Sequence, residues 1–491
     1  MGIVLSEADY RDRVYACWLG KNIGGTLGAP HECKKEILNL TYFDPVPTEA
    51  AANDDLDLQL VWLKMLEDKG PDPALEDFAE YWTRYAAPYP WNEYGFAHRN
   101  LARGLLPPVS GLFENYYIDE MGSPIRSEIW ACVAPGDPQL AAALAWKDSQ
   151  IDHAGGEGTY GEMFWAALES AAFVIDDPMT LIRVGLEMIP HWCRISRAVR
   201  DAVWCWENGI PWAEARERIL RNFGHFQPCH APQNHAFTII GWLYGSDFGD
   251  KLCKAVNCGY DTDCTGATLG ALLGILGGTA GIPAQWRAPV GEAIVLHPYT
   301  RGLEAPKTVA ELTERTVAVA KRLLAERSDV AKIGQRGRVP PNVVGLLSRN
   351  ELALAALAHD VQAATLRAGD LDITLHYNGE PVLRPGIPKV LGVSVERKQK
   401  PVRAKVTLRA PEGWSVGKLR PARGQTRFLV QAPQVADRNS IEVSVAAAGG
   451  EKTVSFTILG PGEAKGYPAG VNVPTCPKCH ARLEACICPR D

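Results

Sequence analysis

The chain has 491 residues, of which 46% are hydrophobic and 22% are charged, and its formal net charge is −6. This length corresponds to roughly two to four domains with a large core, and the composition excludes a wholly disordered chain and a multi-span membrane protein. Because there is no basic excess, we do not expect binding to a nucleic-acid backbone.

Nine of the thirteen cysteines are scattered between Cys17 and Cys264, and four crowd into the last sixteen residues. The scattered cysteines lack the short spacings of a disulfide framework, which predicts free thiols in a reducing compartment. Residues 1–10 carry acidic side chains and no long apolar run. We therefore expect no signal peptide and a cytoplasmic location.

Residues 1–332 are predicted to form an all-α domain. Ser6, with Asp9 three residues later, resembles a capping box in front of an apolar helical pattern. The apolar stretch Gly266 to Ile282 is rich in glycine and is followed by Pro283, which predicts a buried helix and not a membrane span. Further helical patterns cover Asp54 to Lys69, Glu162 to Ile175, Pro178 to Met188, Ser196 to Asn208, Ala213 to Phe223 and Val309 to Ser328.

The pattern changes in the C-terminal third. Residues 333–364 are predicted to be a linker with a helix, because the part from Gly334 to Pro341 is basic and contains glycine and proline. Residues 365–460 show apolar alternation with a period of two, broken by turn residues about every ten positions. This pattern predicts an immunoglobulin-like β-sandwich. Residues 461–491 form a tail rich in proline and glycine.

Two acidic motifs stand at the starts of predicted helices. Asn53-Asp54-Asp55, followed by Asp57, precedes a strongly apolar helix, where simple capping is the alternative to metal binding. The second motif, Gly259 to Gly266, places Asp261 and Asp263 two residues apart, so both carboxylates can face one point in a turn. Oxygen ligands of this kind suit Mg²⁺, Mn²⁺ or Ca²⁺. The alternative is a capped core helix with two solvated acids.

The helix that follows Asp263 has glycine at every fourth position. Gly266, Gly270 and Gly274 clear one face of this helix. We therefore expect another helix to approach it closely beside the acidic motif.

Three further motifs accompany the acidic pairs. The glycine-rich segment Gly20 to Glu32 is not a P-loop, because the final Gly-Lys-Ser/Thr is missing. The other two are Gly122 to Glu128 and Asp152 to Phe173. In the latter, a lone His153 is by itself more typical of a structural histidine than of a functional one.

Taken in order, the five motifs resemble those of the ADP-ribosylglycohydrolases, the dinitrogenase-reductase-activating-glycohydrolase-like family. The family motifs are a Gly-Asp-x-x-Gly-x-Pro-x-Glu loop, Thr-Asp-Asp, Gly-Ser/Ala-x-x-Arg, Ser/Thr-His before a helix, and Asp-Thr-Asp-Thr-Asn-Gly. In this sequence the corresponding residues are 24–32, 53–55, 122–126, 152–153 and 261–266.

The resemblance implies an all-α domain with one or two Mg²⁺ ions in a central cleft, with Mn²⁺ as an alternative. Carried over by position, the metal ligands would be Asn53, Asp54, Asp55, Asp261, Asp263 and Cys264. Glu32, Asp55 and Asp263 would be catalytic: Glu32 or Asp55 would take a proton from metal-bound water, and Asp263 would hold the metal. Gly122, Ser123 and His153 would lie near the phosphates and distal ribose of the substrate.

Several positions depart from the family pattern. Asn53 and Cys264 replace two threonine ligands, and a thiol is a poor ligand for Mg²⁺. Gly25 replaces the aspartate of the first loop, and Tyr260 replaces a common glycine, which narrows the approach to the site. Because of these departures, the sequence leaves open whether a second metal ion binds and whether the site accepts a full ADP-ribosyl group.

The tail contains a candidate zinc site. Cys476, Cys479, Cys486 and Cys488 can enclose one tetrahedral Zn²⁺ ion as a short zinc-ribbon-like element. The second pair is spaced more tightly than usual, so a disordered cysteine-bearing tail is the alternative.

Three functions remain open from the sequence. The first is a metal-dependent glycohydrolase that acts on an ADP-ribosyl linkage in a small molecule or a modified protein. The second is an O- or N-glycosidase with a non-nucleotide sugar or a nucleoside as its substrate. The third is a non-catalytic binding module. All three predict a protein that does not span a membrane, and none of them fixes an oligomeric state.

Overall fold

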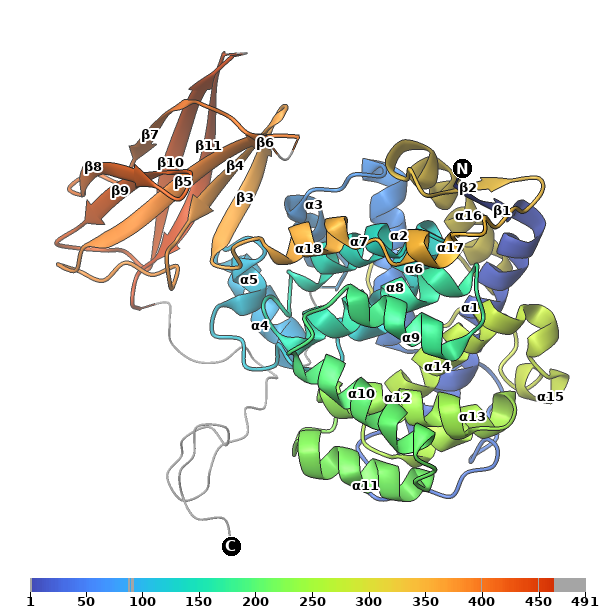
Figure 1. The fold of residues 1–491 in the computed structure, drawn as a ribbon. Coiled ribbons are helices and arrows are strands. Elements are labelled where there is room, and N and C mark those ends of the chain that lie inside the picture. The colour runs from blue at the N-terminus through green and yellow to red at the C-terminus, as the bar shows by residue number, and fades with distance from the viewer. Residues whose placement is uncertain (1, 87–88, 90–91, 399, 449, 463–491) are drawn as a thin grey trace, which may run out of the picture.

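The computed structural model describes residues 2–86, 89, 92–398, 400–448 and 450–462. It has two parts, a large helical body formed by the first two-thirds of the chain and a smaller body of strands at its side (Figure 1). The predicted cysteine-bearing zinc site lies outside the described residues.

The helical body begins with a short strand and a long helix that runs into its centre (Figure 1). Its elements are β1 (Ile3–Ser6), α1 (Glu7–Gly28), η1 (Ala29–His31), α2 (Asp54–Lys69), α3 (Leu75–Tyr81), η2 (Trp82–Ala86), α4 (Asn92–Ala102), α5 (Val109–Leu112), η3 (Pro124–Arg126), α6 (Ser127–Val133), α7 (Pro138–Ser149), α8 (Glu157–Ala172), α9 (Pro178–Glu187), α10 (Arg194–Glu207), α11 (Trp212–Phe223), α12 (Ala231–Tyr244), α13 (Phe248–Asn257), α14 (Thr262–Gly277), η4 (Thr279–Gly281), α15 (Ala284–Arg287) and α16 (Val309–Arg327).

The helices expected from the apolar patterns are present. The pattern Asp54 to Lys69 coincides with α2, and the others agree with α8, α9, α10, α11 and α16 within a few residues at their ends. Ser6 occupies the N-cap position of α1 but makes no side-chain capping hydrogen bond, so the expected capping box is wrong. The strand β1 in front of it pairs in parallel with β2 (Ala331–Gly334), an element that the helical pattern did not predict.

The apolar stretch after Gly266 forms α14, whose residues are buried as far as Ile275. Within the described part of the chain, no helix combines the length and the apolar character that crossing a bilayer requires. The expectation of a buried helix is confirmed.

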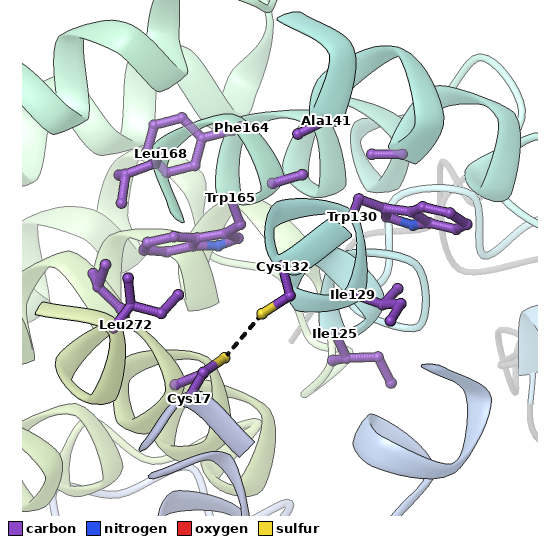
Figure 2. Close-up of a cluster of buried hydrophobic side chains, with 14 of the residues drawn as sticks. Cys17, Ile125, Ile129, Trp130, Cys132, Ala141, Phe164, Trp165, Leu168 and Leu272 are labelled. Carbon is purple, nitrogen blue, oxygen red and sulfur yellow. Dashed lines mark hydrogen bonds between the residues drawn. The ribbon is translucent and has the colours of Figure 1, made fainter. Parts of the chain in front are cut away.

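One continuous hydrophobic core fills the helical body. Figure 2 shows a part of it, where Trp130 and Trp165 lie among aliphatic side chains of several helices. Cys17 and Cys132 meet there with their sulfur atoms 3.8 Å apart. All nine cysteines of the described residues are free and seven of them are buried, as the spacing predicted.

The residues between the two bodies carry two short helices. These are α17 (Val343–Leu347) and α18 (Glu351–Leu357). Within the segment predicted as a linker, Leu347, Ala353 and Ala356 belong to the core of the helical body.

The strand-rich body contains two antiparallel sheets. The larger sheet has the order β3-β4-β5-β9-β8 with β6 beside β5, and the smaller one has the order β11-β10-β7. The strands are β3 (Ala363–Ala368), β4 (Leu371–His376), β5 (Lys389–Arg397), β6 (Lys400–Pro401), β7 (Lys405–Arg409), β8 (Ser415–Ala422), β9 (Gln425–Gln431), β10 (Arg438–Ala447) and β11 (Gly450–Leu459).

A second hydrophobic core lies between these two sheets. Inward-facing residues such as Leu375 and Val393 of the larger sheet share it with Val443 of the smaller one. Leu105 and Val109 of the helical body also belong to this core, and Arg438 Nη1 donates to the carbonyl oxygen of Ala102 at 2.8 Å. The strands are therefore anchored on the α4–α5 region.

Candidate functional site

The centre of the helical body is a crossing of α1 and α14 in which glycines face each other. A Cβ atom at Gly24 would lie 1.8 Å from the carbonyl oxygen of Gly266, and one at Gly20 would lie 2.1 Å from that of Gly270. Only hydrogen fits between the two backbones, so the glycine spacing correctly predicted the close approach of another helix. The crossing places the end of α1, and hence Glu32 shortly after it, beside the first turn of α14.

The first turn of α14 carries the second acidic motif. Asp261 occupies the N-cap position but makes no side-chain capping hydrogen bond. It is 1% exposed, and neither carboxylate oxygen has a hydrogen-bond partner among the described residues. Helix capping therefore does not explain why an aspartate occupies this position. Burial, together with Asp263 and Glu32, raises the pKa of Asp261 well above its ordinary value.

The first acidic motif begins α2 directly opposite. Asn53 is the N-cap residue: its Oδ1 accepts from the amide of Asp55 at 2.9 Å, and its Nδ2 donates to Asp263 Oδ2 at 3.3 Å. The hydroxyl of Tyr94 donates to Asp54 Oδ2 at 3.2 Å. Burial and then Asp263 raise the pKa of Asp54 to about 6.

Three of the predicted metal-binding residues meet most closely. One ligand atom each of Asp55, Asp263 and Cys264 lies within 4.8 Å of the others, and all three side chains are buried. Burial raises the pKa of Asp55, and the negative charges of Asp263 and Asp54 raise it as well. Several carboxylates held this close in a buried position repel each other unless protons or cations compensate them.

Glu32 lies at the exposed rim of this group. The negative charge of Asp263 is the main cause that raises the pKa of Glu32 to about 8, and Asp54 contributes. The structure thus brings Glu32 together with the acids of α2 and α14, which are distant in sequence.

Asp57, the third carboxylate of the first motif, does not join the group. Its Oδ2 accepts from the amide of His297 at 2.7 Å, from Thr300 Oγ1 at 3.0 Å and from Tyr89 OH at 3.2 Å. Asp57 instead fixes the segment 297–300 on α2.

The residues expected near the substrate adjoin Tyr94, whose hydroxyl lies 3.2 Å from Asp54 Oδ2 and 3.1 Å from the carbonyl oxygen of Gly122. Ser123 is fully buried, and its hydroxyl donates to the carboxylate of Glu162. His153 is also fully buried, with Nδ1 2.8 Å from Asp152 Oδ1 and Nε2 3.7 Å from Glu93 Oε1. A Cβ atom at Gly122 would lie 2.0 Å from Glu93 Oε1, so glycine is needed there to admit this carboxyl group.

Tyr260 is held by the loop that follows Glu32. Its amide donates to the carbonyl oxygen of Lys34 at 2.6 Å, and its carbonyl oxygen accepts from the amide of Cys33 at 2.8 Å. Its φ of 70° lies in the left-handed region, which is uncommon for a residue with a side chain. These bonds fix the half-buried Tyr260 beside the Glu32 rim.

Comparison with known proteins shows the family of the chain. The family model of the ADP-ribosylglycohydrolases matches residues 6–330. This chain belongs to the ADP-ribosylglycohydrolase family. One similar solved structure is described as an ADP-ribosylglycohydrolase-related protein complex; it is 23% identical, with a TM-score of 0.44, and the match covers 65% of this chain and 99% of that one. No curated protein matches the chain.

As an ADP-ribosylglycohydrolase, the chain belongs to a family of hydrolases. The helical domain of this type accounts for the matched residues. The family is generally metal-dependent, and the group around Asp55, Asp263 and Cys264 offers ligand atoms for an ion.

Two buried charged residues beside the candidate site were not predicted from the sequence. Lys21 is 1% exposed, with Nζ 2.9 Å from Glu128 Oε1 and 3.8 Å from Asp55 Oδ1. Burial lowers the pKa of Lys21, but the negative charges of Glu128 and Asp55 raise this pKa by more than burial lowers it. The ammonium therefore stays charged behind the acidic group. Glu93 is the second such residue, and burial raises its pKa to about 7. The only signal for Lys21 was its position inside the glycine-rich motif.

A second group of possible metal ligands in the described residues consists of Glu120, His225 and His230. Arg194 Nη1 lies 2.9 Å from His230 Nε2. Since a guanidinium can only donate, His230 accepts there and carries its proton on Nδ1. The positive charge of Arg194 opposes a cation at this position.

Proposed function

We propose that the chain hydrolyses an ADP-ribosyl linkage at C1 of the ribose, with one or two divalent ions, Mg²⁺ or Mn²⁺, bound in the cleft between α2 and α14. The supporting observation is that carboxylates from three separate segments converge while several of their buried oxygens have no hydrogen-bond partner among the described residues. Asp55 Oδ1, Asp263 Oδ1 and both oxygens of Asp261 are in this state. A cation would compensate this charge.

The carboxylate oxygens fit a hard divalent ion, and the proposed ligands are Asn53, Asp54, Asp55, Asp261, Asp263 and Cys264. Such an ion would supply binding of the ribose diol and a lower pKa for a bound water. Either Glu32, at the rim, or Asp55, deeper in the group, would accept the proton of the attacking water. The ammonium of Lys21 would keep the carboxylate of Asp55 in position.

The substrate would enter over the rim that Tyr260 and Glu32 form. We propose that the Gly122–Ser123 turn and His153 shape the region for the distal ribose and phosphates. In this arrangement Glu93, held between Gly122 and His153, presents a carboxyl group whose pKa burial raises to about 7. Bond cleavage would pass through an oxocarbenium-like state, as in other glycoside hydrolases.

The proposal is tested with Asp54→Asn and Asp263→Asn. Release of ADP-ribose from ADP-ribosylated arginine and serine peptides is measured with Mg²⁺ or Mn²⁺ present. Both variants should lose turnover and keep their helical circular dichroism. Asp68→Asn, in the same helix but paired with Lys64 at the surface, is the matched control and should retain activity. Full activity in both site variants would overturn the proposal.

A second candidate substrate is a non-nucleotide sugar or a nucleoside, cleaved as an O- or N-glycoside. The observation that favours it is the fixed position of Tyr260 at the rim, where the family commonly has glycine. A panel of aryl glycosides and nucleosides separates this candidate from the first. A non-catalytic binding module would turn over neither set and would need no ion in the cleft.

We further propose that the C-terminal sheets form an immunoglobulin-like sandwich and that Cys476, Cys479, Cys486 and Cys488 bind Zn²⁺ as a zinc-ribbon-like element. Free cysteines in the described part of the chain support a reducing, cytoplasmic setting. The Zn:protein ratio of protein purified without chelator tests the zinc proposal.

A further inference from the structure

The thiol of Cys264 faces the carboxylate of Asp55 in the candidate metal site. Its Sγ lies 3.6 Å from Asp55 Oδ2, and both atoms are buried. Cys264 is 8% exposed, Asp55 is 1% exposed and Asp263 is 7% exposed. The candidate metal site therefore offers one sulfur atom beside carboxylate oxygens.

The unmet charge of the neighbouring oxygens indicates that a cation belongs here. Asp263 Oδ1 and both oxygens of the buried Asp261 have no hydrogen-bond partner among the described residues. The nearest ammonium, Lys21 Nζ, is 3.8 Å from Asp55 Oδ1 and already contacts Glu128 at 2.9 Å. One ammonium does not neutralise this many buried carboxylates.

The Cys264 Sγ–Asp55 Oδ2 distance, across which the thiol donates a hydrogen bond to the carboxylate, also fits a tetrahedral ion with mixed ligands. Zn²⁺ binds carboxylate oxygen at about 2.1 Å and thiolate sulfur at about 2.3 Å, which places two such ligands about 3.6 Å apart at the tetrahedral angle. Asp55 Oδ2 and Cys264 Sγ have this separation. Mg²⁺ instead requires an octahedron of oxygens at about 2.1 Å, with neighbouring ligands about 2.9 Å apart.

We propose that the position formed by Asp55, Asp263 and Cys264 takes a thiophilic divalent ion of the Zn²⁺ class, with Cys264 as a thiolate ligand, in place of one of the Mg²⁺ or Mn²⁺ ions of the proposed function. The Cys264 S–H bond breaks when the ion binds, the sulfur keeps the electron pair and donates it to the metal, and the proton leaves to solvent. The inference deepens the proposed function, since it names the ion of the same cleft.

Co²⁺ is the probe for this position, because a thiolate bound to Co²⁺ gives a charge-transfer absorption that carboxylates do not give. The full chain is used with Cys476, Cys479, Cys486 and Cys488 replaced by serine in every sample, which removes the thiols of the tail. Metal-free protein is titrated with Co²⁺, and Mg²⁺ is then added in excess. The comparison is with Cys264→Thr, which restores the hydroxyl of the family pattern. Cys253→Ala, a buried cysteine of α13, is the matched control.

The parent protein should give the sulfur band with one Co²⁺ per chain, and Mg²⁺ should not displace it. Cys264→Thr should lose the band and bind Co²⁺ at least about tenfold more weakly relative to Mg²⁺. Cys253→Ala should keep the band. A parent protein without the band, or a band that persists in Cys264→Thr, overturns the inference.

Failure of this inference is distinct from failure of the proposed function. Hydrolysis supported by Mg²⁺ without a sulfur band leaves the function intact and removes the thiophilic ion. A sulfur band that depends on Cys264 in a protein that hydrolyses no ADP-ribosyl linkage confirms the ion and removes the substrate assignment.

Discussion

The backbone of Gly24 touches the backbone of Gly266: a Cβ atom at Gly24 would lie 1.8 Å from the carbonyl oxygen of Gly266. This contact sets the distance between α1 and α14 and thereby the position of Glu32 relative to Asp263. The acidic site depends on a helix crossing in which glycine backbones meet.

Replacement of Gly24 by alanine should therefore damage both stability and metal binding. The methyl group forces the helices apart, and overpacking of this kind costs about 1–3 kcal/mol or more. Urea unfolding and Mn²⁺ titration measure the two effects. Gly277→Ala, at the exposed end of α14 with no neighbouring atom within 4 Å, is the control and should leave both unchanged or raise stability slightly. Equal behaviour of the two variants would contradict this role of the crossing.

The sequence predicted the parts of the site that lie at helix starts. Asn53-Asp54-Asp55 and Asp261 could be found because two acidic motifs each precede a strongly apolar helix, and α2 has the predicted bounds. The glycines of α14 predicted a close helix partner. That this partner is α1 follows from tertiary packing, which the spacing of glycines in one helix does not specify.

The contacts between distant segments could not be predicted. Lys21 follows a glycine on a buried helix, and nothing in its local pattern distinguishes a buried ammonium from a surface lysine. Asp57 lies three positions after Asp54, so the two side chains point only about 60° apart on the helix. Their different partners come from the surrounding segments and not from the local pattern.

Substitutions of Asp57 and of Asp54 should have different effects on stability and on metal binding, although the two residues share one helix turn. Asp57→Ala removes the acceptor of three hydrogen bonds from His297, Thr300 and Tyr89. We expect a loss of about 2–4 kcal/mol in the free energy of unfolding with Mn²⁺ affinity retained. Asp54→Asn should lose Mn²⁺ affinity without loss of stability, because it removes one of several repelling carboxylates. Electron paramagnetic resonance of Mn²⁺ and urea unfolding give the two values, and loss of affinity in Asp57→Ala would show that this residue acts on the site.

Lys21 should be a strong determinant of folding. Lys21→Met leaves Asp55 and Glu128 buried without their ammonium, which costs about 3–5 kcal/mol in comparable cases. Adding Glu128→Gln removes one of the stranded charges and should recover a large part of this loss. A double-mutant cycle by urea unfolding measures the coupling. Additive effects of the two substitutions would contradict the pairing.

His235 should make the folded protein sensitive to acid. Its ring is fully buried against Trp165 and Phe164, with centroids 5.8 and 6.3 Å away, and burial lowers the pKa of His235 to about 4. Below its ordinary pKa of 6.5 the unfolded chain takes up a proton that the folded chain refuses. The contribution of His235 to the free energy of unfolding is therefore fully present above pH 6.5. As the pH drops towards 4, this one group lowers the free energy of unfolding by about 3 kcal/mol. His235→Gln should flatten this part of the stability profile from denaturant titrations at successive pH values, whereas the exposed His191→Gln should not. An unchanged acid slope in His235→Gln would assign the acid sensitivity to other buried groups.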